Sequence, residues 1–551
     1  EITTRLVGSE MCIRDRIMTI NKKKRGYLSF ILSLSLSIGI TGCTKITTKN
    51  NVKEEVKVKE VEEEKVLASV KTSYIEDDIL SYKTILEFEH DNEIVFQNKY
   101  SDMEGIFTFR GNSLRNSPSF GYADLNDKEL EILWEFRTAS SSWGGGAGWT
   151  GQPAIVKWPK ELRESMNIYD EFKGKEDFTE VIYGSLDGNI YFLELNSGKT
   201  TRDKIKVGNP IKGSLSIDPR GIPLLYVGEG INESGVVGFN IYSLIDGCKL
   251  YELNGSDKYA SRGWPAFDSS AIVNTATDSV VVGGENGLLY NIKLNTNYDK
   301  NNNTISIDPK INRYNFSSSF SRGRIGIENS VATYANLAYF ADNGGVIQCV
   351  DLNNLKPVWS INGFDDIDAT LTIDIENDKP YVYCGNEVDH QGTRGVSKIK
   401  KIDGLTGEVI WEKEFECESL IGKSAVNGGL MATNVVGKNN IDNMAIFSLA
   451  RYNGFNKGGM FALNKENGEI IWEKLFDNYM WSSPVDIYDK DGNGYIIQGD
   501  SAGYLHLIDG KEGNIKSSVL LNGNIESSPA VFNNVLVVAT RNGTIYGVKV
   551  K

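Results

Sequence analysis

Histidine is scarce in this chain: only His90, His390 and His506 occur among 551 residues. Three histidines so far apart make a histidine-based metal cluster or catalytic triad hard to assemble. A Walker loop is absent too. The G-x-G-x-x-G match at residues 146–151 is followed by a proline-containing strand, where a dinucleotide site needs a helix. The sequence therefore lacks a recognisable nucleotide-binding or histidine-based motif.

Cysteine and positive charge are also sparse. Of six cysteines, four lie beyond residue 200, with no two adjacent and no C-x-x-C pair: Cys248, Cys349, Cys384 and Cys417. Two disulfides could form in an exported protein, but the spacing specifies no pairing, and we expect buried, inert thiols. The net charge of −14 argues against a nucleic-acid partner, because phosphate binding needs concentrated positive charge.

The apolar run from Tyr27 to Ile40 is short for a membrane span, which needs about 20 apolar residues. It follows a basic run and ends in small residues, the order of a secretory signal. The closing Ile-Thr-Gly-Cys resembles the lipobox of bacterial lipoproteins, whose cysteine is acylated. We therefore expect a lipoprotein signal over residues 17–43 with lipidation at Cys43; the alternative is a signal anchor with a chance cysteine. Residues 1–16 fit nothing downstream and are set aside as an artefactual leader.

Residues 44–85 are expected to form a charged, flexible tether. Their first half is rich in Lys, Glu and Asn and cannot bury enough apolar surface to fold alone. Residues 86–130 would be a lead-in segment that packs on the domain after it. This order predicts an exported protein, held by its lipid on the outer face of the bacterial cytoplasmic membrane or on the periplasmic side of a Gram-negative membrane.

A repeated unit fills the rest of the chain. Each copy opens with small residues that lead into a β-forming run, and the openings lie at 148–156, 211–218, 263–273, 325–334, 366–375, 420–430, 480–489 and 525–534. In the seventh copy four strands are expected, at 482–488, 494–500, 504–510 and 515–521. Asn-Gly and Asp-Gly pairs at matching offsets favour tight hairpins.

One such meander cannot bury both of its faces, so the units should pack radially as an all-β, eight-bladed β-propeller of four-stranded antiparallel blades over residues 131–551. The eighth copy reaches the chain end after its third strand, at 544–550, whereas 132–137 is an isolated strand ahead of the first copy. We expect this N-terminal strand to complete the last blade and close the ring. An open horseshoe with a stray strand is the alternative.

The third-strand, turn and Trp pattern resembles the pyrroloquinoline-quinone-type propeller repeat, as in 459–473, 397–412 and, more loosely, 189–199. Phe107–Asn112 is similar to the Phe-Arg-Gly lead-in that often precedes such propellers. The family includes quinoprotein dehydrogenases, the lipoprotein of the outer-membrane protein assembly machinery, and exported proteins without known catalysis. The resemblance covers about 105–551 and implies the fold, whereas function depends on the site.

Quinoprotein alcohol dehydrogenases stack their quinone between a Trp and a disulfide of neighbouring cysteines, and bind calcium with Glu, Asn and Asp. This chain has no adjacent cysteine pair, is shorter than those enzymes, and offers no trio that maps onto theirs. Pyrroloquinoline quinone is therefore not the expected cofactor, and we expect a non-catalytic protein. A structural calcium could bind at Asp489, Asp491 and Asn493, whose alternating oxygens resemble a calcium loop; a polar hairpin turn is the alternative.

The connections between copies are rich in aromatic and Arg side chains, which binding surfaces favour. In a propeller they share one face around the central channel, and the predicted partner-binding face is Trp143, Trp149, Arg262, Trp264, Phe320, Arg322, Arg324, Phe364, Tyr479 and Trp481. Asp365, Asp366 and Asp368 stand among them. We expect a monomeric binding or scaffold module for a protein or cell-envelope glycan; a quinone-dependent dehydrogenase and a glycan-binding protein are the alternatives.

Overall fold

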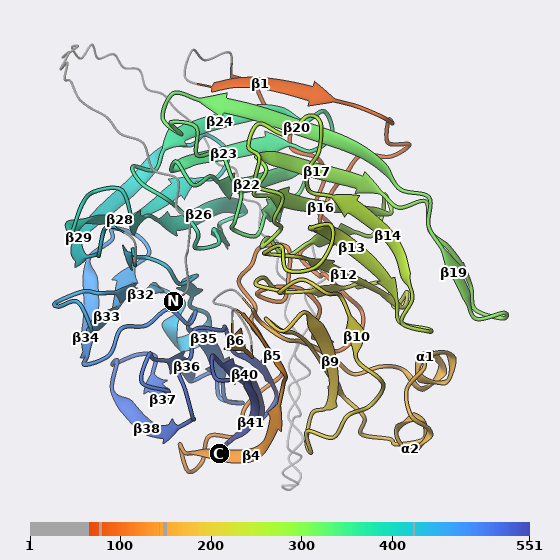
Figure 1. Cartoon of the computed structure of the whole chain (residues 1–551). Coiled ribbons are helices and arrows are strands. Elements are labelled where there is room, and N and C mark those ends of the chain that lie inside the picture. Colours follow the sequence, from red (N-terminus) through yellow and green to blue (C-terminus); the bar gives the residue numbers. More distant parts are fainter. Residues whose placement is uncertain (1–65, 76–79, 143, 147–150, 423–424) are drawn as a thin grey trace, which may run out of the picture. The chain divides into compact units, whose positions relative to one another are not determined.

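Eight antiparallel sheets stand around a ring in the computed structural model (Figure 1). The structure describes residues 66–75, 80–142, 144–146, 151–422 and 425–551, all within the unit Val66–Lys551. Cys43, Trp143 and Trp149 lie outside the described residues. In the described part of the chain, no helix has the length and apolar character to cross a membrane. The ring of sheets confirms the predicted eight-bladed propeller.

Each blade runs from an innermost strand beside the centre of the ring to an outermost strand at its edge. Blade 1 contains β7 (Ala154–Val156), β8 (Glu180–Gly184), β9 (Asn189–Glu194) and β10 (Ile205–Lys206); blade 2 contains β11 (Ser216–Ile217), β12 (Leu224–Gly228), β13 (Gly238–Ser243) and β14 (Lys249–Asn254); blade 3 contains β15 (Ile272–Asn274), β16 (Ser279–Gly284), β17 (Leu288–Lys293) and β20 (Lys310–Ser318); blade 4 contains β21 (Ala332–Tyr334), β22 (Leu337–Ala341), β23 (Val346–Asp351) and β24 (Lys356–Asn362).

The second half of the ring repeats this plan. Blade 5 contains β25 (Thr372–Glu376), β26 (Lys379–Gly385), β28 (Arg394–Asp403) and β29 (Val409–Glu418); blade 6 contains β31 (Val435–Val436), β32 (Met444–Ala450), β33 (Gly458–Asn464) and β34 (Ile470–Phe476); blade 7 contains β35 (Val485–Tyr488), β36 (Gly494–Gly499), β37 (Tyr504–Asp509) and β38 (Ile515–Leu520); blade 8 contains β39 (Ala530–Phe532), β40 (Val535–Thr540), β41 (Thr544–Val550) and β4 (Leu130–Arg137).

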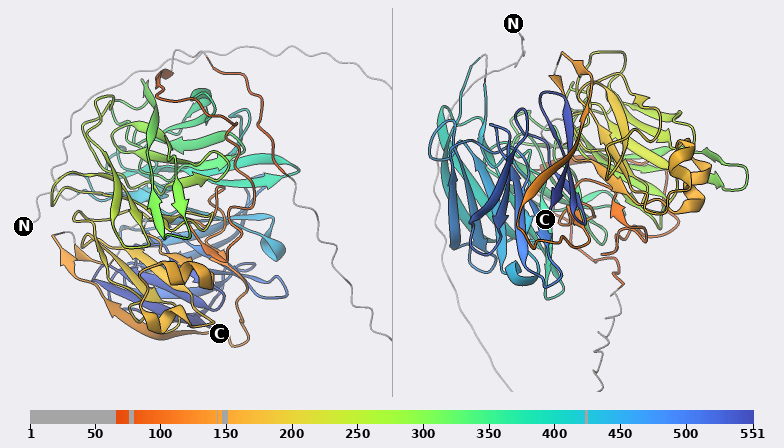
Figure 2. Two further views of the ribbon diagram at one scale, coloured as in Figure 1. Left: turned by 90° about the vertical axis from the view of Figure 1, so that its right-hand side faces the viewer. Right: turned by 90° about the horizontal axis from the view of Figure 1, so that it is seen from below.

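Short elements decorate the ring. β1 (Leu80–Ile85) pairs with β20 at the outer edge of blade 3, and helices α1 (Lys160–Ser165) and α2 (Asp170–Lys173) project from the edge of blade 1 (Figure 2). The others are β2 (Gly105–Ile106), β3 (Ser119–Phe120), β5 (Ser140–Ser141), β6 (Gly144–Gly145), β18 (Asn297–Asp299), β19 (Thr304–Ser306), β27 (Glu387–Val388), β30 (Gly428–Gly429) and the 3-10 helix η1 (Asn439–Ile441).

Neighbouring blades are tied at their inner ends by side-chain hydroxyls. A backbone N–H just before the innermost strand of one blade donates to a Ser or Thr hydroxyl. That Ser or Thr occupies the equivalent position, just before the innermost strand, in the next blade. Bonds of 2.8–3.0 Å join Gln152 to Ser214, Ser270 to Ser330, Ser330 to Thr370, Thr370 to Thr433, and Thr433 to Ser483. These ties explain why the copies open with small hydroxyl residues, since a buried N–H must find an acceptor.

The outer strands are linked between blades by tryptophan. Each indole donates its Nε1–H to a carbonyl of the next blade's third-to-fourth-strand turn, and its ring packs on that turn's glycine. The bonds run from Trp134 to Leu195, Trp359 to Gly404, Trp411 to Lys465, and Trp472 to Gly510, at 2.8–3.0 Å. The Trp-and-Gly spacing of the repeat is thus the contact that holds one blade against the next.

The ring closes at blade 8 as the sequence predicts. β4 pairs antiparallel with β41, from Leu130 opposite Val550 to Arg137 opposite Thr544. Trp134 then links this blade to blade 1. Strands from both ends of the repeated region therefore share one sheet, and the seam is joined in the same way as the interior of the ring.

The sixth copy begins later than the sequence indicates. Its opening was expected at 420–430, but the innermost strand of blade 6 is β31 at Val435–Val436. Residues 428–429 instead form β30, which pairs with β27 from the second-to-third-strand connection of blade 5. The tying hydroxyl belongs to Thr433, so small residues alone were a misleading guide at this copy.

Residues 105–120 cross the inside of the ring and contact all eight blades; we call them the crossing segment. β2 pairs with β7 and β3 with β39, in blades 1 and 8. Between them, hydrogen bonds reach blades 2 to 7 at Ile217, Ala271, Thr333, Ile373, Asn434 and Asp486. Arg110 and Arg115 are fully buried within this segment.

Candidate functional site

The Ser or Thr whose hydroxyl links two blades is called the tying residue of its blade. The position two residues before it is a second repeated position. In blades 2 to 7 it holds Lys212, Asp268, Glu328, Asp368, Met431 and Trp481; in blade 8 the equivalent position holds Glu526, two residues before Ser528, whose hydroxyl has no hydrogen-bond partner among the described residues. Neighbours touch: Lys212 ion-pairs with Asp268, and the Trp481 indole contacts the Met431 sulfur. Because fourth-to-first-strand connections share one face, these seven side chains surround the opening of the ring on that face. We call them the mouth ring.

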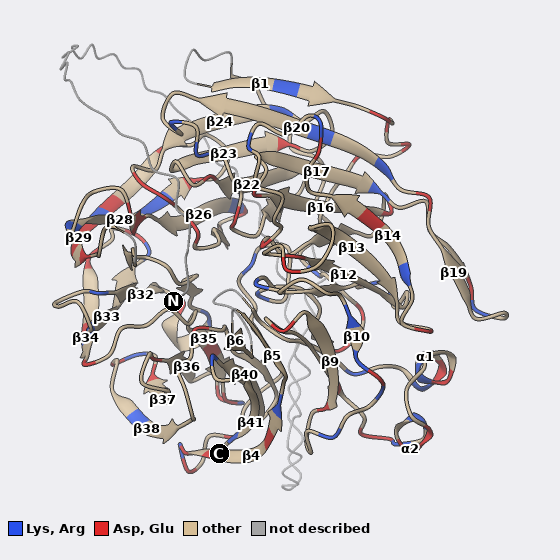
Figure 3. Cartoon of the chain, viewed as in Figure 1, with Lys and Arg blue, Asp and Glu red and all other residues tan. Residues whose placement is uncertain are grey.

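Buried carboxylates gather on one side of this opening; Figure 3 shows the charged residues along the chain. The acid cluster is Asp268, Glu285, Glu328, Asp366, Asp368 and Glu387. All but Glu328 are less than a tenth exposed. Glu285 and Glu387 follow the second strands of blades 3 and 5, and the others lie between blades. Oxygens of Asp268, Glu285 and Glu328 all lie within 4.8 Å of one another.

Electrostatics in the cluster oppose ionisation. Burial raises the pKa of Glu285, Asp366, Asp368 and Glu387 well above the usual range, and the neighbouring carboxylates raise it further. Burial also lowers the pKa of Lys212, but Asp268 and Glu285 outweigh that effect and raise it above normal. The cluster therefore favours protonated carboxyl groups around one buried ammonium, and a second cation would favour their ionised form.

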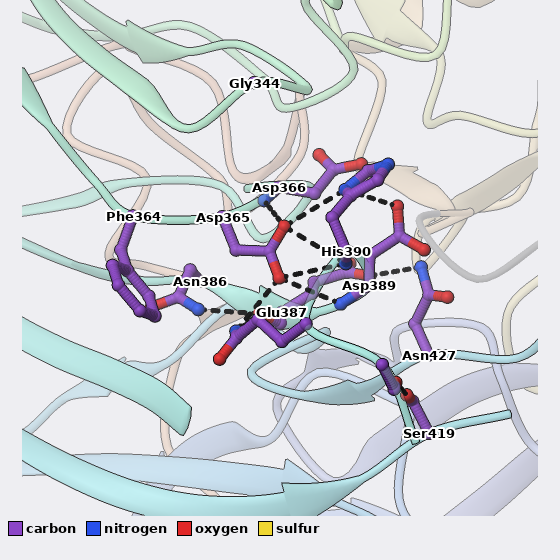
Figure 4. Close-up of polar contacts among 12 residues, drawn as sticks. Gly344, Phe364, Asp365, Asp366, Asn386, Glu387, Asp389, His390, Ser419 and Asn427 are labelled. Carbon is purple, nitrogen blue, oxygen red and sulfur yellow. Dashed lines mark hydrogen bonds and ion pairs between the residues drawn. The ribbon is translucent and has the colours of Figure 1, made fainter. Parts of the chain in front are cut away.

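A histidine stands beside the cluster, in the connection after β26 (Figure 4). His390 Nδ1 lies 3.0 Å from Asp365 Oδ1 and 2.9 Å from Asp389 Oδ2. Asp365 also accepts hydrogen bonds from the backbone N–H groups of Asp389 and His390 and from the Gln391 amide. Burial lowers the pKa of His390, but the two carboxylates outweigh it and raise the pKa to about 9. The imidazole is therefore a cation at neutral pH.

The predicted face residues separate into groups. Arg262 Nη1 donates to Asn343 Oδ1 at 2.9 Å, and Asn343 Nδ2 donates to Glu328 Oε1 at 2.7 Å, so Arg262 supports the acid cluster. Arg324 is close enough to His390 to lower its pKa. Arg322 is exposed, and Trp264 and Phe320 are 43% and 36% exposed.

Of the other members, Tyr479 and Trp481 pack together at the start of blade 7, and Phe364 lies apart from His390. Tyr479 and Trp481 meet edge-on with ring centres 6.2 Å apart, and the Arg451 guanidinium lies 4.3 Å from the Tyr479 ring centre. Phe364 lies on the opposite side of Asp365 from His390 (Figure 4), under Lys398 at 4.7 Å. Phe364 is half exposed with a φ of 94°, a strained backbone for a bulky residue.

A surface hollow of about 480 Å³ opens between blades 5 and 6 on the same face. Thr393, Arg394, Glu418, Ser419, Leu420 and Phe455 line it. Leu420 and Ile421 are 43% and 57% exposed in the connection between these blades. The sequence analysis did not find this hollow, because its walls come from three connections whose approach depends on the fold.

Two sequence signals fall on turns. In the predicted calcium loop, Asp489 Oδ1 accepts the backbone N–H groups of Asp491 and Asn493, and Oδ2 accepts the Asn493 amide; calcium there stays a prediction. Residues 499–503 spell G-x-S-x-G, a match the sequence analysis missed. They form the turn between β36 and β37, whereas a nucleophile elbow joins a strand to a helix.

The residues associated with quinone binding do not assemble here. The buried cysteines Cys349, Cys384 and Cys417 lie in β23, β26 and β29, and Cys248 is exposed in blade 2. A disulfide between neighbouring cysteines cannot form from this set, so the residues present do not fit the quinone platform described for the dehydrogenases, and no reaction step is derived through it.

No family model and no curated protein matches the sequence. Among solved structures, the chain resembles quinohemoprotein alcohol dehydrogenase from Pseudomonas putida HK5, with 10% identity and a TM-score of 0.52 over 81% of this chain and 80% of that chain. The enzyme from Comamonas testosteroni gives 12% identity and 0.52 over 82% and 81%. BamB from Moraxella catarrhalis gives 16% and 0.46 over 76% and 97%. The likeness to the two alcohol dehydrogenases confirms the β-propeller fold.

Proposed function

We propose that the protein is a non-catalytic binding or scaffold module. It is anchored by a lipid at Cys43 outside the bacterial cytoplasmic membrane, and its mouth face holds a protein or a cell-envelope glycan. One observation carries the proposal: the mouth ring contains acid, base, aromatic and thioether side chains, although the tying residues two positions later are mostly Ser or Thr. A uniform frame with varied side chains at its opening is how a propeller presents a specific surface.

Exposed side chains near the mouth ring support this role. Trp264 precedes Asp268 by four residues, and Phe320 precedes Glu328 by eight, so both aromatics stand in connections that feed the acid cluster. Arg322, two residues after Phe320, is exposed. Aromatic and Arg side chains dominate binding energy at protein interfaces, where each anchor contributes about 2 kcal/mol or more. The hollow between blades 5 and 6 adds a concave surface on this face.

A co-purification experiment tests the proposal with a matched control. Trp264→Ala and the pair Arg322→Ala with Arg324→Ala should each deplete a partner recovered with the full-length protein from native membranes. Tyr122→Ala is the control, because Tyr122 is 59% exposed and follows Gly121, which packs on Asn533 in a first-to-second-strand turn on the opposite face. Equal recovery with all variants would contradict the proposal.

The two alternatives have separate tests. Calorimetric titration with pyrroloquinoline quinone and calcium addresses a quinone-dependent dehydrogenase, and tight binding would replace the present proposal with that one. A glycan array separates a glycan from a protein partner on the same face. In either case the mouth variants should lose the ligand and the Tyr122 variant should keep it.

A further inference from the structure

We propose that Asp268, Glu285 and Glu328 bind a hard divalent cation, with calcium as the probe ion, at the mouth between blades 3 and 4. This site is separate from the Asp489 loop and goes beyond the proposed function, since a partner could dock on the exposed aromatics without it.

The three carboxylates have the spacing of a metal site. One oxygen from each lies within 4.8 Å of the other two. Two ligands on opposite sides of a calcium ion, each 2.3–2.6 Å from it, lie about 4.6–5.2 Å apart, and ligands at smaller angles lie closer. An ion can therefore contact all three oxygens without a large movement of the backbone. Carboxylate oxygens are the ligands that calcium and magnesium prefer.

Unpartnered buried oxygens are the second observation. Glu285 is 2% exposed, and its Oε1 has no hydrogen-bond partner. The Lys212 ammonium lies 3.6 Å from that oxygen, close enough for an ion pair but too far for a hydrogen bond. Asp366, Asp368 and Glu387 each hold another buried oxygen without a hydrogen-bond partner in the described part of the chain, and all three interact electrostatically with Glu328. A buried polar atom without a hydrogen-bond partner destabilises the fold, and a bound cation would supply the missing contact.

Neighbouring side chains orient the Glu328 carboxylate of the proposed site. Asn343 donates to Glu328 Oε1, and Arg262 in turn holds Asn343, so two residues outside the trio fix the Glu328 carboxylate. Such outer partners orient metal-binding groups in proteins. On the Asp268 side of the trio, Lys212 forms an ion pair with Asp268. The Lys212 ammonium competes with an incoming cation for Asp268, so removing its charge should strengthen binding.

Calorimetry and terbium luminescence on the full-length protein test the site. Wild type should bind calcium at this site, displaceable by magnesium. Glu285→Gln and Glu328→Gln should each weaken that binding at least tenfold, and Lys212→Met should strengthen it. Glu526→Gln is the matched control: it occupies the same mouth-ring position in blade 8, is buried, and pairs with Arg541. Circular dichroism establishes that each variant is folded.

Three results would overturn the site. The first is no calcium or terbium binding by folded wild-type protein. The second is equal weakening by Glu285→Gln and Glu526→Gln, which would reduce the effect to general negative charge. The third is that Asp489→Asn loses calcium binding while Glu285→Gln keeps it, which would place the ion in the blade 7 turn. Partner recovery in the co-purification experiment is read separately, so failure of one proposal does not imply failure of the other.

Discussion

At the residue scale, two histidines face opposite surroundings. His390 lies between Asp365 and Asp389, and its pKa is raised to about 9. His90 contacts Asn291 and the Phe88 ring; burial, with Lys293 nearby, lowers its pKa to about 4. Both start from about 6.5 when unfolded. Folding therefore favours the charged form of His390 and the neutral form of His90.

The two residues should give pH responses of opposite sign. Stabilisation by charged His390 is complete below pH 6.5 and is lost as the pH rises through 9, so His390→Gln should lower the melting temperature more at pH 6 than at pH 9.5. The neutral His90 loses its advantage as the pH falls from 6.5 toward 4, so His90→Gln should relieve part of the acid destabilisation at pH 5. Thermal melts across pH measure both, and parallel curves for the two variants would contradict this assignment.

At the element scale, the contact of Trp411 with Gly468 is repeated around the ring. Gly468 has a φ of 71°, and a Cβ there would stand 2.8 Å from the Trp411 ring. Gly235 has a similar φ of 77° but nothing within 4 Å of that Cβ. Gly235→Ala should therefore cost only the backbone strain, about 1 kcal/mol. Gly468→Ala should cost about 1–3 kcal/mol more through overpacking. Urea unfolding compares them, and equal midpoints would show that the indole contact does not hold the blades together.

The crossing segment carries the second element-scale prediction. Arg115 donates to the carbonyls of Val331, Phe109 and Ser270 and to the Thr108 hydroxyl, at 2.7–2.9 Å. Arg115→Met should remove these bonds, leave the acceptors unpaired, and destabilise the protein by about 3–5 kcal/mol. Arg394→Met is the control, because that side chain is 71% exposed and forms its ion pair with Glu416, which is 68% exposed; the substitution should change stability by less than about 1 kcal/mol. Similar losses in both variants would contradict a structural role for the crossing segment.

The sequence predicted contacts that recur and missed those that occur once. The Trp and Gly spacing repeats, so the blades and their seam at 132–137 followed from it. The crossing segment is a single stretch, and nothing in Phe107–Asn112 shows that its arginine would be fully buried, because Arg is ordinarily a surface residue. Asp366 and Asp368 were noticed as charges near the face. The sequence could not assign Glu285 and Glu387 to the acid cluster, because they come from second-to-third-strand connections. How closely these connections approach the others depends on how the blades pack. Aligning the copies on their tying hydroxyls would have found Asp268, Glu328 and Asp368 together.

At the scale of the whole molecule, the ring has two different faces. The mouth face carries the mouth ring, the acid cluster, the hollow between blades 5 and 6, and exposed aromatics. On the opposite face lie the first-to-second-strand turns, such as that of Asn533 against Gly121. Between the faces, the crossing segment hydrogen-bonds to every blade and holds the inner strands together. The frame therefore stays regular while the mouth side chains differ from blade to blade.

The central claim is that the mouth face binds the partner. Site-specific photo-crosslinking in native membranes tests this claim most directly. A photoreactive amino acid replaces Trp264, Phe320 or Phe364 on the mouth face, and Tyr122 or Leu475 elsewhere; all five are at least a third exposed. Mass spectrometry then identifies each adduct, and the purified partner is titrated against wild type and Trp264→Ala. The account predicts one recurring partner from the mouth positions, absent from Tyr122 and Leu475, with weakened binding to the variant. The same adducts from all five positions, or adducts from Tyr122 and Leu475 alone, would contradict it.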